Sequence, residues 1–387
     1  MNANTAVQRA VDAALAAGEI GVQVAAYLDG ELVVDVCGGL ADEASGRPVD
    51  ARTLFPVFSV TKAVAATALH LQAERGLLDY EAPIARYWPE FGAHGKGAAT
   101  VRQVLTHRLG VPQMPADVTP DRLCDWEWMA ERIAALEPIF PPGTRSAYLA
   151  LNYGWLIGEI VRRTDPQRRA FGRFLQEEIC APLAIDDLWV GTPDHEQARV
   201  ATLQDLPPPP PDAPPQDPET ARLFAMAVQP ITALTQEFMG RPDVRRACLP
   251  GFGGLFNARS LARFFALLAH GGALDGVRLL SAERVRSFTV PRERAEEIDA
   301  ILGFPMHLGQ GGFYLGGESP PSPAAIGRNP RTLAFPGAGG AVGWADLDAR
   351  LAVGICHNRL FDGPMNPVGN PFVAIGDAIR SALGVPG

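Results

Sequence analysis

The chain of 387 residues is long enough for one large domain or two, and its 47% apolar and 20% charged residues are ordinary for a globular protein. A formal net charge of -9, without a dense run of Lys and Arg, excludes the usual signature of a nucleic-acid partner. Five scattered cysteines without a Cys-x-x-Cys pair indicate reduced, buried thiols rather than a metal or redox site.

The start of the chain lacks the basic residues and the uninterrupted apolar core of a signal peptide. No stretch elsewhere provides about 20 consecutive apolar residues, the length needed to cross a bilayer. We therefore expect a cytoplasmic protein without a membrane partner.

The first elements predicted along the chain are a helix and a β-hairpin. Residues 5–17 are rich in alanine and place apolar residues at helical spacing. Two apolar runs, 21–28 and 31–36, flank Asp29-Gly30, which is a strong hairpin signal. The sheet therefore begins with antiparallel strands.

The middle of the chain is mainly helical in pattern. Helices are predicted over 63–76, 101–106, 126–136, 151–163 and 171–179. The proline-rich run 206–218 cannot enter a helix or a sheet interior, so we interpret it as a stiff surface loop. A ligand for an SH3-type domain is the alternative interpretation of this run.

Strand patterns return in the last third of the chain. The predicted elements are a helix over 260–268, strands over 332–344 and 350–357 around a turn at 345–349, and a helix over 371–383. Because strands occur at both ends of the chain, the two ends should share one sheet. The predicted fold is α+β, an antiparallel sheet flanked by helices within a single domain, 1–387. Residues 1–76 and 240–387 form an α/β lobe, 77–239 form an inserted helical lobe, and a cleft lies between the lobes.

Several common catalytic motifs are absent from the chain. It contains no Gly-x-Ser-x-Gly, the nucleophile elbow of α/β-hydrolases, and no His-Glu-x-x-His metal motif. The glycine cluster 337–343 is followed by a strand pattern rather than a helix, which argues against a dinucleotide loop.

Ser59 and Lys62 form the first candidate pair for chemistry. Residues three apart on a helix are neighbours on one face, so the hydroxyl and the amine can touch where the helix begins. A lysine in this position can act as the base that activates a serine nucleophile. The alternative is a helix N-terminus that carries a solvated lysine.

Tyr148 is the second candidate, in the loop before the helix predicted over 151–163. A phenol is a poor base at its usual pKa, but nearby cations would lower that pKa and favour phenolate. With Lys62 beside it, such a tyrosine could pass the proton of Ser59 to a leaving group. His107, by contrast, is interpreted as a structural hydrogen-bonding residue at a helix end.

At this point the sequence resembles the serine β-lactamase and penicillin-binding-protein superfamily, in particular class C β-lactamases and the similar family VIII carboxylesterases. The resemblance rests on four segments whose order and spacing match from about residue 20 to 360: Phe58-Ser59-Val60-Thr61-Lys62 with Gly76-Leu77-Leu78-Asp79, Val101 to His107, Pro142-Gly143-Thr144 with Tyr148, and Phe335 to Gly340. It implies the β-lactamase/transpeptidase-like fold and an acyl-enzyme mechanism without a metal or organic cofactor.

Carried over to this sequence, the family pattern makes Ser59 the nucleophile, Lys62 its proton acceptor and Tyr148 the second acid/base. The resemblance also implies that the backbone N–H groups of Ser59 and Ala338 form the oxyanion hole. The motif Lys-Thr-Gly of β-lactamases falls on Phe335-Pro336-Gly337, which implies that Phe335 and Gly337 contact the substrate.

Two departures from the family pattern bear on the substrate. Ala150 stands where β-lactamases place an Asn, and Phe335 stands where they place a cationic Lys. A β-lactam carboxylate needs such partners, so we expect hydrolysis of carboxylic esters of small or medium acyl groups. Asn152 could partly substitute for the missing Asn. A small-molecule ester is the expected partner, and the alternatives are an acyltransferase, an amidase or β-lactamase, or a silent binding protein.

The acyl pocket is predicted only as a set of apolar or aromatic candidates. These are Trp126, Trp128, Met226, Phe252, His307 and Phe313. For each of them, ordinary packing is the alternative.

Overall fold

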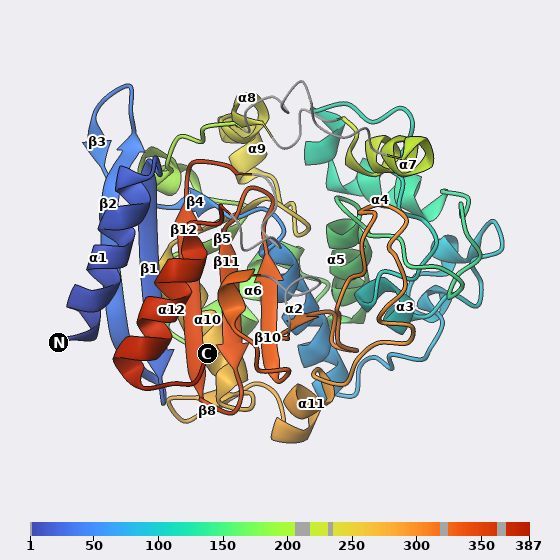
Figure 1. Ribbon diagram of the computed structural model, residues 1–387. Coiled ribbons are helices and arrows are strands. Elements are labelled where there is room, and N and C mark those ends of the chain that lie inside the picture. Colours follow the sequence, from blue (N-terminus) through green and yellow to red (C-terminus); the bar gives the residue numbers. More distant parts are fainter. Residues whose placement is uncertain (1, 206–216, 231–234, 318–323, 362–368) are drawn as a thin grey trace.

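The computed structural model describes residues 2–205, 217–230, 235–317, 324–361 and 369–387. A seven-stranded antiparallel sheet, in the order β3-β2-β1-β12-β11-β10-β9, forms one side of the molecule (Figure 1). Its strands are β1 Gly21–Leu28, β2 Glu31–Asp42, β3 Arg47–Pro48, β9 Tyr314–Leu315, β10 Thr332–Pro336, β11 Val342–Asp346 and β12 Leu351–His357. β1 pairs with β12 from Val22↔His357 to Leu28↔Leu351, so the prediction that both ends of the chain share one sheet is confirmed.

The two β-hairpins at the ends of the chain follow from their turn residues. Asp29 and Gly30 have φ of 50° and 85°, the positive values that a tight hairpin turn requires. The prediction of one strand over 332–344 is wrong, because β10 ends at Pro336 and β11 begins at Val342. Gly339 and Gly340, with φ of 81° and 124°, turn the chain back between these strands.

Helices cover both faces of the sheet. α1 (Ala3–Ala16) and α12 (Phe372–Leu383) lie on one face, and α10 (Ala258–Ala269) lies on the other (Figure 1). α10 approaches closely because Gly354 in β12 lacks a side chain: a Cβ there would lie 2.7 Å from the carbonyl oxygen of Ala258. α10 begins two residues before the predicted start, since Asn257 accepts a hydrogen bond from the N–H of Ser260 and caps the helix.

The predicted helices of the middle region are present, and three further strands accompany them. The predicted helices are α2 Thr61–Glu74, α3 Val101–Leu105, α4 Trp126–Ala134, α5 Tyr153–Thr164 and α6 Phe171–Leu175. Four further helices were not predicted: α7 Pro218–Val228, α8 Gln236–Met239, α9 Pro242–Arg246 and α11 Ala282–Ser287. A small sheet, β4 (Phe55–Pro56), β6 (Gly254–Phe256) and β5 (Leu188–Val190), joins the two lobes. β7 (Ala273–Leu274) and β8 (Val277–Arg278) form a separate two-stranded sheet. Of the proline-rich run, 206–216 lie outside the described residues.

α2 lies at the centre of the molecule, between the sheet and the helical lobe (Figure 1). Every residue from Thr61 to Ala73 is buried, so this helix has no solvated face. One continuous cluster of buried apolar side chains includes residues of both lobes. The start of α2 is therefore held from all sides, which fixes the position of Ser59 and Lys62.

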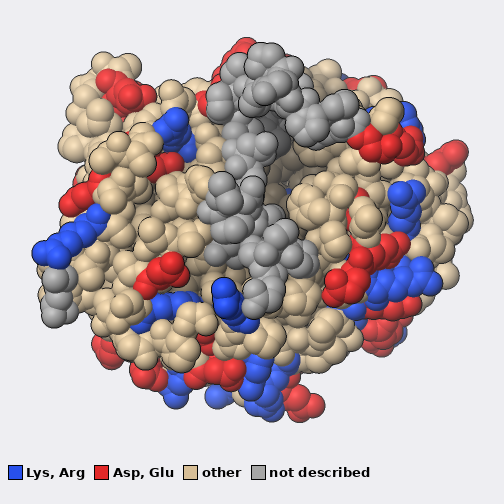
Figure 2. All heavy atoms as spheres, in the orientation of Figure 1, with Lys and Arg blue, Asp and Glu red and all other residues tan. Residues whose placement is uncertain are grey.

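The surface and the thiols show two further features. On the face in Figure 2, Lys and Arg are interspersed with Asp and Glu and form no continuous basic area. All five cysteines are free thiols. In the described part of the chain, no helix combines the length and the apolar character needed to cross a membrane.

Candidate active site

Ser59 lies at a sharp turn between β4 and α2. Phe58, directly before it, has φ of 46°, in the left-handed region that bulky residues rarely adopt. The hydroxyl of Thr61 donates to the carbonyl of Phe58 and accepts from the N–H of Gly254 in β6 at 3.0 Å, which holds this turn. The N–H of Lys62 donates to the carbonyl of Ser59 at 2.9 Å. This tight first turn places the side chains of Ser59 and Lys62 on the same face.

Lys62 is buried completely, and its amine lies beside the serine hydroxyl. Its Nζ is 2.9 Å from Ser59 Oγ, 2.7 Å from the carbonyl oxygen of Ala150 and 2.8 Å from that of Gly251. Burial lowers the pKa of Lys62 well below its usual value, because the charged form loses its hydration. A neutral amine has two N–H groups for the two carbonyls, and its lone pair then points at Ser59 Oγ. This geometry is that of a general base.

The two carbonyls that hold Lys62 come from segments in very close contact. Ala150 precedes α5, and Gly251 precedes β6. A Cβ at Gly154, in the first turn of α5, would lie only 2.1 Å from the backbone nitrogen of Gly251. Glycine at this position is therefore what allows both carbonyls to reach one amine.

Tyr148 completes the trio from the other side of Ser59. Its phenol donates to Ser59 Oγ at 3.0 Å, and Lys62 Nζ lies 5.0 Å from the centre of its ring. The prediction of a phenolate is wrong for this resting arrangement. Burial raises the pKa of Tyr148, and the charge of Asp299 adds to the rise, which outweighs the effect of the hydrogen bond to Ser59. Tyr148 is therefore a neutral phenol and a proton donor.

His107 has the structural role predicted for it. It is buried, with φ of 56°, and its carbonyl accepts from the N–H of Ala147 at 2.9 Å. Its Nδ1 accepts from the N–H of Leu149 at 3.0 Å, so these two bonds flank Tyr148 on both sides. Burial lowers the pKa of His107, and the positive charge of Arg292 adds to this effect, which keeps the imidazole neutral.

The two backbone N–H groups predicted as the oxyanion hole belong to segments that touch. A Cβ at Gly337 would lie 2.3 Å from the carbonyl oxygen of Val57, so the end of β10 packs against the chain just before Ser59. Ser59 and Ala338 are both partly exposed. Within the described ranges, neither N–H donates to another residue. No described residue thus competes with a substrate oxygen for these two donors, and their role stays a prediction.

Several predicted substrate-binding residues lie in the core instead of on an open surface. Phe335 is buried, with its ring perpendicular to that of Tyr314 at 5.5 Å between centres, and Gly337 is buried against Val57. Phe313 is buried and stacks on Phe288 at 5.7 Å. Phe252 is buried next to Trp155, with 6.1 Å between ring centres. The backbone of Gly337 adjoins the segment before Ser59, and the other three residues pack within the core.

Of five other predicted residues, three have contacts that define their roles, and the other two are partly buried. Trp126 packs on Gly158 of α5, with its indole N–H donating to Glu159, and the guanidinium groups of Arg122 and Arg132 lie over Trp128. The amide of Asn152 donates to the carbonyls of Val111 and Gln113 at 2.6 and 3.1 Å, so it does not replace the Asn missing at Ala150. Met226, on α7, and His307 are partly buried.

The acceptors of Lys62 and the carboxylate that holds the backbone of Tyr148 could not be found from the sequence. Ala150 and Gly251 act through their carbonyls, which carry no residue-specific signal. Asp299, which accepts the N–H of Tyr148 at 3.1 Å, lies 151 positions further along the chain. Only the fold brings these groups together.

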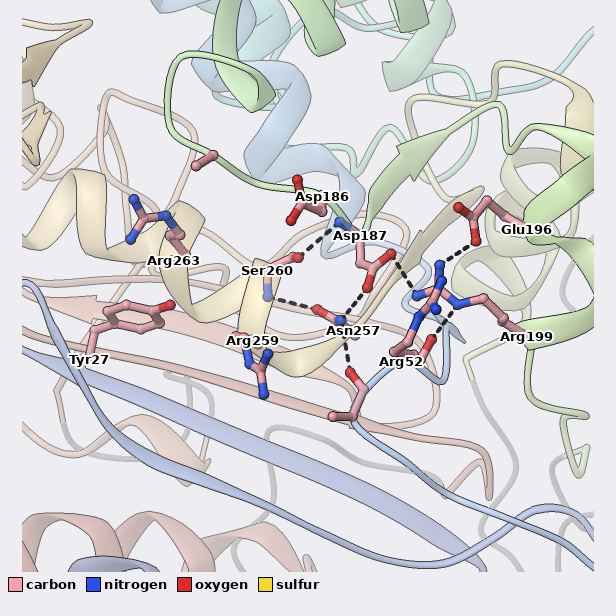
Figure 3. A pocket seen from close by; sticks show the side chains of 12 residues that line it. Tyr27, Arg52, Asp186, Asp187, Glu196, Arg199, Asn257, Arg259, Ser260 and Arg263 are labelled. Atoms are coloured by element: carbon pink, nitrogen blue, oxygen red, sulfur yellow. Dashed lines mark hydrogen bonds and ion pairs between the residues drawn. The ribbon is translucent and has the colours of Figure 1, made fainter.

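A separate hollow of about 480 Å³ lies beside α10 (Figure 3), and Ser59 is not among the residues that line it. Its polar side chains chiefly bind one another: Arg199 pairs with Asp187 at 2.6 Å, and Asn257 donates to Asp187 at 2.8 Å. The N–H of Asp187 donates to Ser260 Oγ at 3.1 Å. These bonds connect α10 with the segment before β5, so we interpret this hollow as a polar joint between the lobes. Among the described residues, no group of His, Cys, Asp or Glu could hold a metal ion.

The fold, with a serine and a lysine at the start of its central helix and a tyrosine facing them, defines a protein of the serine β-lactamase and penicillin-binding-protein class. The Beta-lactamase family matches residues 7–378, and the chain belongs to this family.

Individual relatives cover nearly the whole chain. The chain is 34% identical to Esterase/beta-lactamase LipL of Mycobacterium tuberculosis, over 94% of this chain and 82% of LipL. A crystal structure of a family VIII carboxylesterase superposes with a TM-score of 0.88 at 31% identity, covering 99% of this chain and 98% of that one. A penicillin-binding protein homologue from Caulobacter crescentus gives a TM-score of 0.83 at 33% identity, with the same coverage.

Proposed function

We propose that this protein is a carboxylesterase that hydrolyses esters through an acyl-enzyme on Ser59. One observation carries the proposal: Ser59 Oγ lies 2.9 Å from a buried amine and 3.0 Å from a partly buried phenol, each suited to move one proton. The names of the similar proteins, an esterase/β-lactamase and a family VIII carboxylesterase, support it.

Acylation follows from the resting protonation states. Ser59 Oγ attacks the ester carbonyl while its proton passes to the lone pair of Lys62. The N–H groups of Ser59 and Ala338 stabilise the oxyanion, at about 3 kcal/mol for each donor. The C–O bond to the alcohol then breaks, and the phenol of Tyr148 gives its proton to the leaving oxygen. The acyl-enzyme is left with an ammonium at Lys62 and a phenolate at Tyr148, which stabilise each other.

Deacylation returns both protons. The phenolate of Tyr148 takes a proton from a water molecule, and the hydroxide attacks the acyl carbonyl. Ser59 Oγ then leaves and regains its proton from Lys62. The cycle ends with a neutral amine and a neutral phenol, the states that burial favours before the reaction.

The surroundings of the trio favour esters over β-lactams. Ala150 belongs to an apolar cluster with Leu223, Ala227 and Val228 of α7, and the side chain of Tyr148 packs against this cluster. β10 carries the buried Phe335 where β-lactamases carry a cationic Lys. The amide group and the carboxylate of a β-lactam would both lack the polar partners that β-lactamases place at the positions of Ala150 and Phe335. An ester of a small or medium acyl group needs neither partner.

The direct test compares a short p-nitrophenyl ester with a chromogenic cephalosporin, using the wild type and Ser59→Ala. We expect ester turnover that Ser59→Ala abolishes, and little cleavage of the cephalosporin. Strong cephalosporin turnover would contradict the substrate class, and ester turnover in Ser59→Ala would place the nucleophile elsewhere.

We further propose that the protein works in the cytoplasm on small-molecule esters. The free thiols support a reducing compartment. The mixed charges on the face in Figure 2 and the net charge of -9 support a small-molecule partner rather than a nucleic acid.

A further inference from the structure

A buried carboxylate holds the backbone of Tyr148. Asp299 has no exposed surface, and its Oδ1 accepts hydrogen bonds from the N–H of Tyr148 at 3.1 Å, of Ile301 at 2.9 Å and of Leu302 at 3.1 Å. Its Oδ2 accepts from the hydroxyl of Ser146 at 2.6 Å. All these contacts bring a hydrogen to a carboxylate oxygen, so Asp299 is present as an anion although burial raises its pKa.

Arg292 supplies the balancing charge at the other end of this network. It is 3% exposed, and its Nη2 donates to Ser146 Oγ at 2.8 Å while its Nη1 donates to the carbonyl of Thr106 at 2.6 Å. The N–H of Ala300 also donates to the carbonyl of Ser146, at 3.0 Å. The loop that carries Arg292 and Asp299 is thus bonded to the segment of Tyr148 through several independent contacts.

Stability alone does not require this arrangement at the catalytic tyrosine. A buried ion-containing network costs desolvation, and apolar side chains of similar volume often serve a core equally well. The network instead meets two needs of the proposed mechanism. The phenol must point at Ser59 Oγ, and it must keep its proton until the alcohol leaves.

We propose that Asp299, with Ser146 and Arg292, is a positioning residue for Tyr148, which fixes the phenol on Ser59 Oγ and holds it as the proton donor to the leaving alcohol. The inference rests on the proposed esterase function. Two effects combine: the bond to the N–H of Tyr148 sets the direction of the side chain, and the negative charge of Asp299 opposes the formation of a phenolate.

Other groups also face the phenol of Tyr148. Lys62 Nζ lies 5.0 Å from its ring centre, and the ring of His107 lies 4.7 Å away. The phenols of Tyr153 and Tyr314 also interact electrostatically with Tyr148. Lys62 and His107 are neutral in the resting enzyme and the two phenols carry no charge, so Asp299 is the anion in this set.

The leaving group provides a readout that a merely structural role would not change. An alkoxide is a strong base and must be protonated as it leaves, whereas p-nitrophenolate is a weak base and leaves without a proton. A variant with a misplaced phenol should therefore lose kcat/KM on an alkyl ester and keep much of it on the p-nitrophenyl ester of the same acid. A variant that only loses stability should lose both equally.

The experiment measures kcat/KM for methyl butyrate and p-nitrophenyl butyrate, together with the melting temperature. Tyr148→Phe removes the phenol hydroxyl and so gives the largest expected change in the ratio of kcat/KM for the methyl ester to kcat/KM for the p-nitrophenyl ester. For Asp299→Asn, which keeps the shape of the side chain, we expect the ratio of methyl to p-nitrophenyl ester to fall at least 10-fold. Ser146→Ala, which removes only the hydroxyl between Arg292 and Asp299, should lower the ratio in the same direction and decides the question if Asp299→Asn does not fold.

Asp346 offers a closely matched control. It is also a buried carboxylate, and it accepts from Arg380 at 3.0 Å, from Asn329 at 2.7 Å and from the N–H groups of Asp348 and Ala349. Asp346→Asn should lower the melting temperature and leave the ratio unchanged.

The outcomes separate this inference from the proposed function. If Asp299→Asn and Ser146→Ala lower kcat/KM for both esters by the same factor, Asp299 is only structural and the inference is overturned. If Ser59→Ala still hydrolyses either ester, the proposed function itself fails.

Discussion

The chain contains only two lysines, Lys62 and Lys96, and this allows a matched test of the catalytic base. Both are completely buried, and both donate to two backbone carbonyls, those of Ala150 and Gly251 for Lys62 and those of Ala93 and Leu136 for Lys96. Burial lowers the pKa of both amines. They differ in their other neighbours: Lys62 lies beside Ser59 and over the ring of Tyr148, whereas Lys96 lies over the ring of Phe91.

Replacement by methionine removes the amine and leaves two buried carbonyls without their donors. Each unsatisfied carbonyl costs about 1–3 kcal/mol, so Lys62→Met and Lys96→Met should each lose up to roughly 6 kcal/mol of unfolding free energy. The gain from no longer burying an amine offsets part of this loss in both variants. In activity, by contrast, the two variants should differ. A general base contributes about 10²–10⁴-fold to the rate, and only Lys62→Met should lose this contribution.

The assay is kcat/KM for p-nitrophenyl butyrate beside denaturant unfolding of both variants. We expect comparable losses of stability and a loss of activity of at least about 100-fold confined to Lys62→Met. Equal losses of activity in the two variants would show that the amine of Lys62 acts through the fold and not as a base.

Three further predictions concern the site geometry and its pH dependence. Gly337→Ala should lower both melting temperature and kcat/KM, because its Cβ would lie 2.3 Å from the carbonyl oxygen of Val57 and push the Ala338 donor away. Gly97→Ala is the control and should leave both unchanged, because Gly97 is exposed and its Cβ would lie 3.8 Å from its nearest neighbour, the carbonyl oxygen of Gly92. Gly154→Ala should weaken the hold on Lys62, seen as a fall in kcat at unchanged KM, since its Cβ would lie 2.1 Å from the nitrogen of Gly251; unchanged kcat would refute this. Because burial lowers the pKa of Lys62, kcat/KM should rise with pH to a midpoint well below the usual lysine value of about 10.4, and a midpoint at or above that value would contradict a neutral base.

The same pKa shift has a consequence for stability. Between the lowered pKa of Lys62 in the folded state and its unfolded value, the unfolded chain binds more protons than the folded one. The stability of the wild type relative to Lys62→Met should therefore rise as the pH rises through this window. A difference that stays constant or falls with pH, measured by denaturant unfolding, would contradict the shift.

Much of the fold and the core of the site could be predicted from local patterns. The turn Asp29-Gly30, the helical periodicity of α1, α5 and α12, and the spacing of Ser59 and Lys62 are all encoded within short segments. The hairpin between β10 and β11 was missed, because its glycines were interpreted as part of a single strand pattern. The two-residue strand β4 and its short partners, β5 and β6, are too brief to give a periodic signal.

The electrostatics of the site could not be predicted, because they depend on burial and on distant residues. The phenolate prediction for Tyr148 considered Lys62 alone and omitted the burial of the phenol and the charge of Asp299. The burial of several aromatic candidates for the acyl pocket could not be predicted for a similar reason. A Phe such as Phe313 has the same composition signal in a core as in a binding site, and only the tertiary packing decides between them.

The central claim, that Ser59 is the nucleophile, is tested most directly by covalent labelling. The wild type and Ser59→Ala are incubated with an alkyl fluorophosphonate, and the mass of the intact protein and of its peptides is measured. The account predicts one adduct per wild-type chain, on the peptide that contains Ser59, and none on Ser59→Ala. An adduct on another residue, an equal adduct on Ser59→Ala, or an unlabelled wild type would contradict it.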